Sequence, residues 1–220
     1  MIPAYEEAPR IGPVIEAARA HLAVLVVDDG STDGTADRAR GAGADVLVLE
    51  RNQGKGAALR AGFRRVLDEG FGAALTLDAD GQHDPAEIPA FVTAFATDRP
   101  DLVIGRRDFS QMPPVRRLSN RLGRLALSWA IGQDVPDNQS GYRLVSRRLM
   151  EALADSRASG FEFEVEMIAR CVANGYALDW VPIRTIYAGE PTHIRPMTHL
   201  GGFVRASLAA RRLVRESRGS

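Results

Sequence analysis

Two aspartates separated by one alanine follow a predicted strand in the middle of the sequence. The apolar run at residues 73–77 has the length of a buried strand, and Asp78 and Asp80 stand at its carboxyl end. Two such carboxylates can share a metal, or one can hold a ribose while the other binds the metal, and hard oxygen ligands suit Mg²⁺ or Mn²⁺. An ion held there would neutralise the charge that develops on a departing nucleoside diphosphate. The pattern therefore predicts a site for group transfer.

The residues that follow strengthen this prediction, because a pair of acids alone is a common accident. Gly81 frees the backbone to turn, and Gln82 and His83 add neutral oxygen or nitrogen ligands. The alternative is a solvated turn in which Asp84 and Pro85 begin the next helix. Turn chemistry alone explains three acids within seven residues poorly.

The elements that must position these groups alternate along the chain. Strands are expected at residues 23–27, 46–49, 73–77 and 101–105, and helices at residues 7–20, 55–69 and 86–96. This order predicts an α/β fold with a mostly parallel sheet covered on both faces, in which ligands gather at the carboxyl ends of the strands. Ile2 has the character of the last residue of a strand, so we expect the first strand to be truncated.

Gly54, Lys55 and Gly56 stand where the helix at 55–69 begins. They do not form a phosphate loop, because the earlier glycine and the Ser or Thr after the lysine are absent. The third glycine of a dinucleotide fingerprint is missing too, so NAD binding is unsupported. A glycine-rich helix start with one lysine can still approach a donor phosphate, and a simple helix entry remains the alternative.

Composition limits the partners and the compartment. A chain of 220 residues with 45% hydrophobic residues can bury one substantial core, so we expect a single catalytic domain. Lys plus Arg equal Asp plus Glu at 28 each, which gives no support for a nucleic-acid partner. The lone Cys171 excludes an intramolecular disulfide and fits a reducing cytoplasm. No apolar run approaches the roughly 18 residues of a membrane span.

The second half of the chain is rich in charged motifs. Residues 112–131 alternate arginines with leucines, which fits a helix with a basic face resting on an anionic membrane or, equally, a solvated arginine face. Residues 137–143 pack acid, amide, hydroxyl, glycine and arginine into seven positions. Glu162, Glu164 and Glu166 fall in a predicted helix but cannot share one face at a spacing of two. Residues 179–183 predict an edge strand, and residues 199–216 a basic closing helix.

Taken together, the motifs PAYEE, VVDDGSTDGT, NQGKGAAL, LDADGQHDP, IGRR, DNQSGYR and VPIRTIY occur in the order seen in family 2 glycosyltransferases with the GT-A fold. More narrowly, the chain resembles the dolichol- or polyprenyl-phosphate sugar synthases, and the resemblance covers almost the whole chain. It implies a GT-A catalytic domain over residues 1–197 and a basic C-terminal helix over residues 198–220. The sequence departs from the commonest pattern of these proteins at Glu6 and Arg106, which leaves the preferred nucleobase open.

The resemblance also implies roles for individual residues. Asp80 and Gln82 would hold Mg²⁺ or Mn²⁺ against the diphosphate, and Asp80, Asp137 and Arg143 form the expected catalytic set. Arg143 and Arg195 would bind the acceptor phosphate, where the fork of a guanidinium suits them. The donor would be bound by Pro3, Tyr5, Glu7, Asp29, Lys55, Asp78, Ala79 and Arg107.

The implied reaction moves a sugar with inversion from a GDP- or UDP-linked donor to a polyprenyl phosphate. A phosphate monoester is largely dianionic at neutral pH, with a second pKa of about 6, so it needs little help from a base. Asp137 is the candidate either for steering the acceptor or for taking a proton. We expect a cytoplasmic protein, with peripheral contact at the inner face of the membrane as an open question. A soluble or saccharide acceptor, and a catalytically silent nucleotide-sugar-binding module, remain alternatives.

Overall fold

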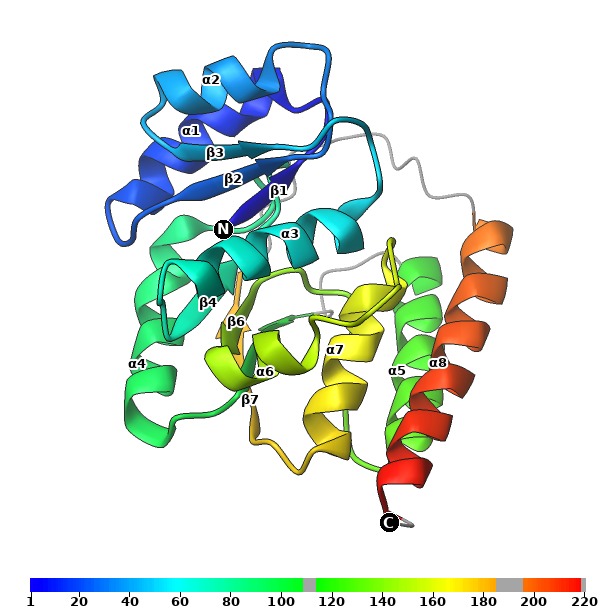
Figure 1. Ribbon diagram of the computed structural model, residues 1–220. Helices are drawn as coiled ribbons and strands as arrows, with labels where there is room; N and C mark the ends of the chain where they lie inside the picture. Colours follow the sequence, from blue (N-terminus) through cyan, green and yellow to red (C-terminus); the bar gives the residue numbers. More distant parts are fainter. Residues whose placement is uncertain (109–113, 185–195, 219–220) are drawn as a thin grey trace.

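The computed structural model describes residues 1–108, 114–184 and 196–218. Strands and helices alternate through the first half of the chain and most of the second (Figure 1). The first half contains β1 (Ile2–Ala4), α1 (Ala8–Arg19), β2 (Leu25–Asp28), α2 (Thr35–Gly41), β3 (Asp45–Val48), α3 (Lys55–Asp68) and β4 (Ala73–Thr76). The second half contains the short 3₁₀ helix η1 (Pro85–Glu87), α4 (Ile88–Asp98), β5 (Leu102–Arg107), α5 (Pro114–Ile131), β6 (Arg143–Ser146), α6 (Arg147–Ala152), α7 (Glu162–Ala173), β7 (Leu178–Ile183) and α8 (Pro196–Arg218).

The strands form two hydrogen-bonded groups that meet edge to edge. One group has the order β1, β2, β3 and is parallel throughout; the other has the order β4, β6, β5, β7. Met1 joins them, since its amine donates to the Leu75 carbonyl (2.7 Å) and its carbonyl accepts from the Leu77 amide (3.2 Å). The result is one continuous order, β3–β2–β1–β4–β6–β5–β7, in which only β6 runs against its neighbours. The predicted mostly parallel α/β fold is confirmed.

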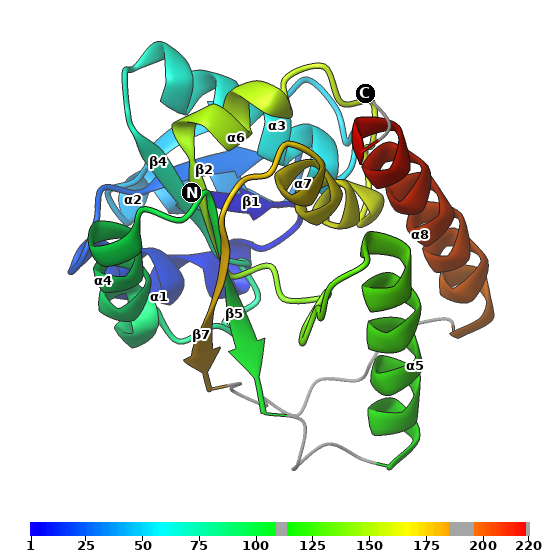
Figure 2. The ribbon, with the colours of Figure 1, turned by 90° about the horizontal axis from the view of Figure 1, so that it is seen from below.

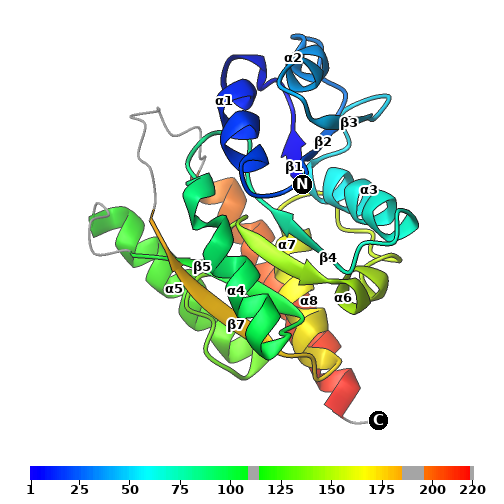
Figure 3. The same cartoon turned by 90° about the vertical axis from the view of Figure 1, so that its left-hand side faces the viewer.

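Each face of the sheet carries its own apolar core. Alternate strand residues point to opposite faces, so Val27 and Ile104 belong to one cluster while Val26 and Val103 belong to the other. Helices α3, α5, α6, α7 and α8 cover the first face, and α1, α2 and α4 cover the second. Figure 3 shows α4 on one side of the sheet and α7 and α8 on the other. The loops at the strand ends are thereby held between two packed layers.

Strand β6 and helix α6 are among the elements that were not predicted from the sequence. Strand β6 is only four residues long, begins with an arginine and follows a polar loop, so it carries no strand pattern of its own. It inserts between β4 and β5 and sets Arg143 opposite both Thr76 and Ile104. The six-residue helix α6 follows it directly, capped by the Ser146 hydroxyl. These two short elements fix where the polar loop at 137–142 lies.

The predicted edge strand is confirmed. Strand β7 pairs only with β5 in the described part of the chain, and Pro182, which has no N–H to donate, stands opposite Arg106. Helix α8 closes the chain against α7 and α5. Within the described ranges, none of the helices has both the length and the apolar character required to cross a bilayer.

Candidate active site

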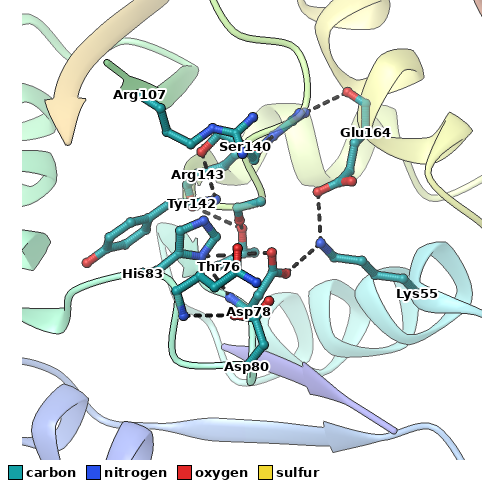
Figure 4. Close-up of polar contacts among 12 residues, drawn as sticks. Lys55, Thr76, Asp78, Asp80, His83, Arg107, Ser140, Tyr142, Arg143 and Glu164 are labelled. Atoms are coloured by element: carbon teal, nitrogen blue, oxygen red, sulfur yellow. Dashed lines mark hydrogen bonds and ion pairs between the residues drawn. The ribbon is translucent and has the colours of Figure 1, made fainter. Parts of the chain in front are cut away.

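An ion-pair triad lies just beyond the end of β4. The Lys55 Nζ, at the start of α3, is 2.5 Å from Asp78 Oδ1 and 3.1 Å from Glu164 Oε1 (Figure 4). Burial alone would lower the pKa of Lys55, but the two carboxylates outweigh it and hold that pKa above its ordinary value. Burial would likewise raise the pKa of Asp78, and the charge of Lys55 brings it below its ordinary value instead. Lys55 and Asp78 are therefore both charged at neutral pH.

Glu164 is a member of this site that the sequence did not single out. It lies in the first turn of α7, where its side chain reaches Lys55 and its backbone carbonyl accepts from Arg143 Nη1 (2.6 Å). Spacing left it indistinguishable from Glu162 and Glu166. The structure separates them, since Glu162 accepts from the amides of residues 159 and 160 while Glu166 binds Ser156 and Arg170. Glu164 thus contacts Lys55 through its side chain and Arg143 through its backbone.

His83 is held as a neutral ring next to Asp78. The Asp78 backbone N–H donates to His83 Nδ1 (3.1 Å), which requires an unprotonated nitrogen at that position. Burial lowers the pKa of His83, although the carboxylates of Asp78 and Asp80 act against that shift. The ring also packs against Tyr142, with 5.1 Å between the ring centroids. His83 therefore shapes the turn after β4 as a hydrogen-bond acceptor.

Asp80 is the carboxylate in this cluster whose charge is not paired. Its Oδ1 accepts from the Gln82 amide (2.9 Å), and no ion pair reaches it within the described residues. Its side chain is half-exposed, in contrast to the buried Ala79 beside it. No group of three or more His, Cys, Asp or Glu side chains with metal-binding geometry occurs in the described ranges. Asp80 with Gln82 fits an ion that takes one carboxylate and completes its shell with phosphate oxygens and water, as Mg²⁺ does.

Arg143 is buried, with 1% of its surface exposed, and its guanidinium holds backbone carbonyls. Nε donates to Ser140 (2.8 Å), Nη2 to Asn138 (3.2 Å) and Nη1 to Glu164. Burial lowers the pKa of Arg143, and the carboxylates around it, Glu164 and Asp137 foremost, oppose that shift. In this arrangement the side chain fixes the loop at 137–142 to the start of α7. Its predicted role at a phosphate stays a prediction.

Asp137 and Arg107 form a two-pronged ion pair at the end of β5. Arg107 Nε lies 2.7 Å from Asp137 Oδ2, and Nη2 lies 2.9 Å from Oδ1. The amides of Arg107 and Gln139 also donate to the same carboxylate. The carboxylate of Asp137 thus holds Arg107 and two backbone amides. Its two predicted roles, steering the acceptor or taking a proton, stay predictions.

The predicted donor-binding residues of the first half lie around the ends of β1 and β2. Asp29 is buried and accepts from the amides of Gln53 (2.9 Å) and Gly54 (2.7 Å), which ties this loop to the start of α3 beside Lys55. Pro3 is buried in β1, whereas Tyr5 is 47% exposed just beyond it. Glu7 precedes α1 and pairs with Arg10. Their contacts with a nucleotide stay predictions.

Two glycines stand where an added side chain would disturb this geometry. A Cβ on Gly141 would lie 2.6 Å from Asp78 Oδ2 and 2.8 Å from Lys55 Nζ, so a side chain there would enter the ion pair. A Cβ on Gly56 would lie 2.9 Å from the Ala158 carbonyl, and the Gly56 amide donates to the Ser159 carbonyl (2.6 Å). At Gly56 a neighbouring backbone segment excludes a side chain, and at Gly141 a side chain would displace the charged ends of Asp78 and Lys55.

The structure brings most of the predicted residues to one edge of the sheet. Lys55, Asp78, Asp80, Arg107 and Arg143 lie in one region, beyond the ends of β4 and β5 and at the start of β6 (Figure 4). Asp29 joins them through Gly54. Arg195 lies outside the described residues.

A sequence profile described as "Glycosyl transferase family 2" matches residues 1–154. The chain belongs to this family. It is a glycosyltransferase, and the resemblance seen in the motifs is confirmed.

Individual relatives of this glycosyltransferase agree. A UDP-N-acetylglucosamine–dolichyl-phosphate N-acetylglucosaminyltransferase of Methanococcus voltae is 30% identical over 216 residues, covering 85% of this chain and 84% of the relative. An undecaprenyl-phosphate mannosyltransferase of Micrococcus luteus is 35% identical over 175 residues, covering 73% and 70%. Among solved structures, glucosyl-3-phosphoglycerate synthase from Mycobacterium tuberculosis, in complex with Mg²⁺ and UDP, has a TM-score of 0.72 at 24% identity, over 96% of this chain and 77% of that one. The last comparison supports the fold.

Proposed function

We propose that this glycosyltransferase moves a sugar, with inversion, from a GDP- or UDP-linked donor to a polyprenyl phosphate. The observation that carries the proposal is the contrast between two neighbouring aspartates. Lys55 neutralises Asp78, whereas Asp80 has no cationic partner in the described part of the chain. A site built in this way attracts a cation that arrives with a diphosphate. The two relatives named for lipid phosphates support the choice of acceptor.

The donor pocket in this proposal spans two loops rich in aspartate, at residues 28–33 and 78–84. Asp80 and Gln82 would hold Mg²⁺ or Mn²⁺, which would supply charge neutralisation at the leaving diphosphate. The amine of Lys55 and the guanidinium of Arg107 lie at the same edge and suit the phosphates. The nucleoside would lie against Pro3, Tyr5, Glu7, Asp29, Asp78 and Ala79.

The acceptor side needs orientation more than activation. A phosphate monoester with a second pKa of about 6 is largely dianionic at neutral pH, so no side chain has to remove a proton from it. In our proposal Asp137 keeps Arg107 in one orientation through their two-pronged pair, and Arg143 keeps the loop at 137–142 against α7. Both act as positioning residues, which suits a reaction governed by placement and charge. Arg195 is proposed to meet the acceptor phosphate.

A lipid acceptor implies work at a membrane. We propose that the protein is cytoplasmic and contacts the inner face of the membrane peripherally. A chain with one cysteine cannot form an intramolecular disulfide, which fits a reducing compartment. Cys171 itself lies in the core, where burial raises the pKa of its thiol to about 12.

A transfer assay tests the reaction. Radiolabelled GDP- and UDP-sugars are incubated with Mn²⁺ or Mg²⁺ and either a detergent-dispersed polyprenyl phosphate or a water-soluble saccharide, and label is followed into organic solvent. We expect label in the organic phase only with polyprenyl phosphate and metal. Transfer to the saccharide alone would establish the soluble-acceptor alternative. Donor binding without transfer or hydrolysis would establish a silent binding module.

A further inference from the structure

Helices α5 and α8 have an apolar outer side that the core does not require. Their inner sides, which include Leu127 and Ile131 of α5 and Val214 of α8, are already buried in the main cluster. On the outer side of α5, Leu125 and Trp129 are 56% and 61% exposed and stand one helical turn apart. Leu125 and Trp129 therefore give α5 a contiguous exposed apolar strip, and contiguous apolar surface marks interaction sites.

The outer side of α8 continues the same surface. Val204 and Leu208 are 48% and 53% exposed, and with Arg211 they follow the spacing of one helix face. The Arg211 guanidinium carbon lies 3.6 Å from the centroid of the Trp129 ring, so this face borders the exposed side of α5. Figures 1 and 2 show the two helices side by side. We call Leu125, Trp129, Val204, Leu208 and Arg211 the α5–α8 seam.

Positive charge surrounds the seam. Arg205, Arg212 and Arg215 are exposed on α8. By sequence α5 contains four arginines and α8 five, and Glu216 is the sole acid in the two helices, although the whole chain has a formal net charge of zero. Exposed apolar side chains with a tryptophan and flanking arginines are the composition of helices that lie in the interface of an anionic membrane.

We infer that the α5–α8 seam rests on the surface of an anionic bilayer, with the Trp129 ring at headgroup depth and the surrounding arginines on lipid phosphates. The inference rests on the proposed function, because a polyprenyl phosphate must be reached at a membrane. A second copy of the chain fits the seam less well, since a symmetric pair would bring arginines against arginines. Helix α7 separates the seam from the ion-pair cluster: it packs on α8 and carries Glu164 in its first turn. The seam therefore sets the orientation of the site towards the lipid.

Quenching of tryptophan fluorescence locates the contact. The chain has two tryptophans, so the Trp180→Phe variant leaves Trp129 as the single reporter. We expect brominated phosphatidylglycerol in vesicles to quench Trp129, and expect little quenching when the brominated lipid is a phosphatidylcholine in vesicles that lack anionic lipid. Absence of quenching with anionic vesicles at low salt overturns the inference.

Substitutions at the seam measure its contribution. Because both leucines are exposed, Leu125→Ser with Leu208→Ser leaves the core intact, and we expect vesicle co-flotation to weaken by about tenfold or more. Arg205→Gln with Arg212→Gln is expected to weaken binding to anionic vesicles about fivefold or more per arginine, and binding to neutral vesicles little. Phe71→Ser is the matched control, since Phe71 is 50% exposed in the turn between α3 and β4. Equal binding by the seam and control variants places the contact elsewhere and overturns the inference.

Two further measurements separate the possible outcomes. Sedimentation without lipid tests for self-association. A dimer that dissociates when the leucine substitutions are introduced would show that the seam is an interface between copies. Transfer is then compared with the acceptor in vesicles and in detergent. We expect the seam variants to lose transfer only with vesicles. If the unmodified protein binds vesicles through the seam but transfers sugar to polyprenyl phosphate in neither form, the proposed function fails and the surface assignment stands.

Discussion

The loops on the two sides of this site use carboxylates in different ways. In the first half of the chain, Asp28, Asp29 and Asp33 accept hydrogen bonds from backbone amides and a hydroxyl, and no cation pairs with them in the described residues. In the second half, Asp137 binds a guanidinium and Asp101 binds Arg148. Asp78 likewise binds Lys55, which α3 supplies from the first half.

This difference matches the chemistry that each side would meet. Carboxylates held by amides fix the shape of a loop while it keeps its negative charge, which suits hydroxyl and N–H donors such as those of a ribose and a base. Carboxylates held by cations make the local charge nearly neutral, and the cations suit phosphate. Asp80 is the exception on the second side, because its hydrogen-bond partner within the described residues is the Gln82 amide. The predictions below test this division, from the largest expected effect to the smallest.

Removing Arg143 tests whether cations hold the second side together. We expect Arg143→Met to lower the free energy of unfolding by about 3–5 kcal/mol, because the carbonyls of Ser140, Asn138 and Glu164 lose their donor inside the protein. Urea unfolding measures the change. Arg40→Met is the control, since Arg40 pairs with Asp37 on the surface and its loss is expected to cost under about 0.5 kcal/mol. An equal loss of unfolding free energy in the two variants would show that Arg143 does not hold the loop at 137–142 to α7.

Asp80→Ala tests the one carboxylate on the second side that we describe as lacking a cationic partner within the described residues. We expect transfer to fall by about 10²–10³-fold, because charge on the leaving diphosphate loses its compensation, and the variant should require more Mn²⁺ for its residual rate. The same loop provides a control in Asp84→Ala, where the carboxylate caps η1. That variant should lose about 1 kcal/mol of stability and keep its metal requirement. An unchanged Mn²⁺ requirement in Asp80→Ala would remove Asp80 from the proposed metal site.

Asp29→Asn tests the amide-bound carboxylates. An asparagine presents one oxygen and one N–H₂ group to the amides of Gln53 and Gly54, so one hydrogen bond is replaced by two donors facing each other. We expect a loss of about 2 kcal/mol of stability, measured by urea unfolding. The loss should be the same at low and high salt, since no ion pair is broken. A strong dependence on salt would show that a cation contributes on this side as well.

The pH dependence of stability tests Asp101. Burial would raise the pKa of this carboxyl, but hydrogen bonds from Arg148, Ser146 and the Ala177 amide bring it below its ordinary value of 3.8. The unfolded chain therefore takes up this proton first, and the stability that Asp101 contributes is complete above pH 3.8 and is lost as pH falls below it. Asp101→Asn should flatten the acid limb of the stability curve by about 1 kcal/mol, a modest figure because Arg148 is exposed to solvent. An identical acid limb in both proteins would contradict the assignment.

Prediction from the sequence succeeded where a short run of residues determines the outcome. The strand before Asp78 is predicted by an apolar run and the acids that follow it, and the helix predicted to contain Glu162, Glu164 and Glu166 is α7. It failed where an outcome depends on distant pairing. Strand β6 forms because β4 and β5 leave a place between them, and Glu164 is selected from three similar glutamates only by the position of Lys55. The partners of Asp137 and Arg143 likewise follow from sheet register.

Position 141 has a consequence for how this loop can change. Since any Cβ there would meet both Asp78 and Lys55, a larger residue must either displace these two side chains or lift the chain away from the end of β4. Arg143 is only two residues further along, so lifting the chain would draw its guanidinium off the carbonyls of α7 and of its own loop. The absence of a side chain at position 141 therefore lets the Lys55–Asp78 ion pair and the contacts of Arg143 form together, and a substitution there is expected to disturb one or the other.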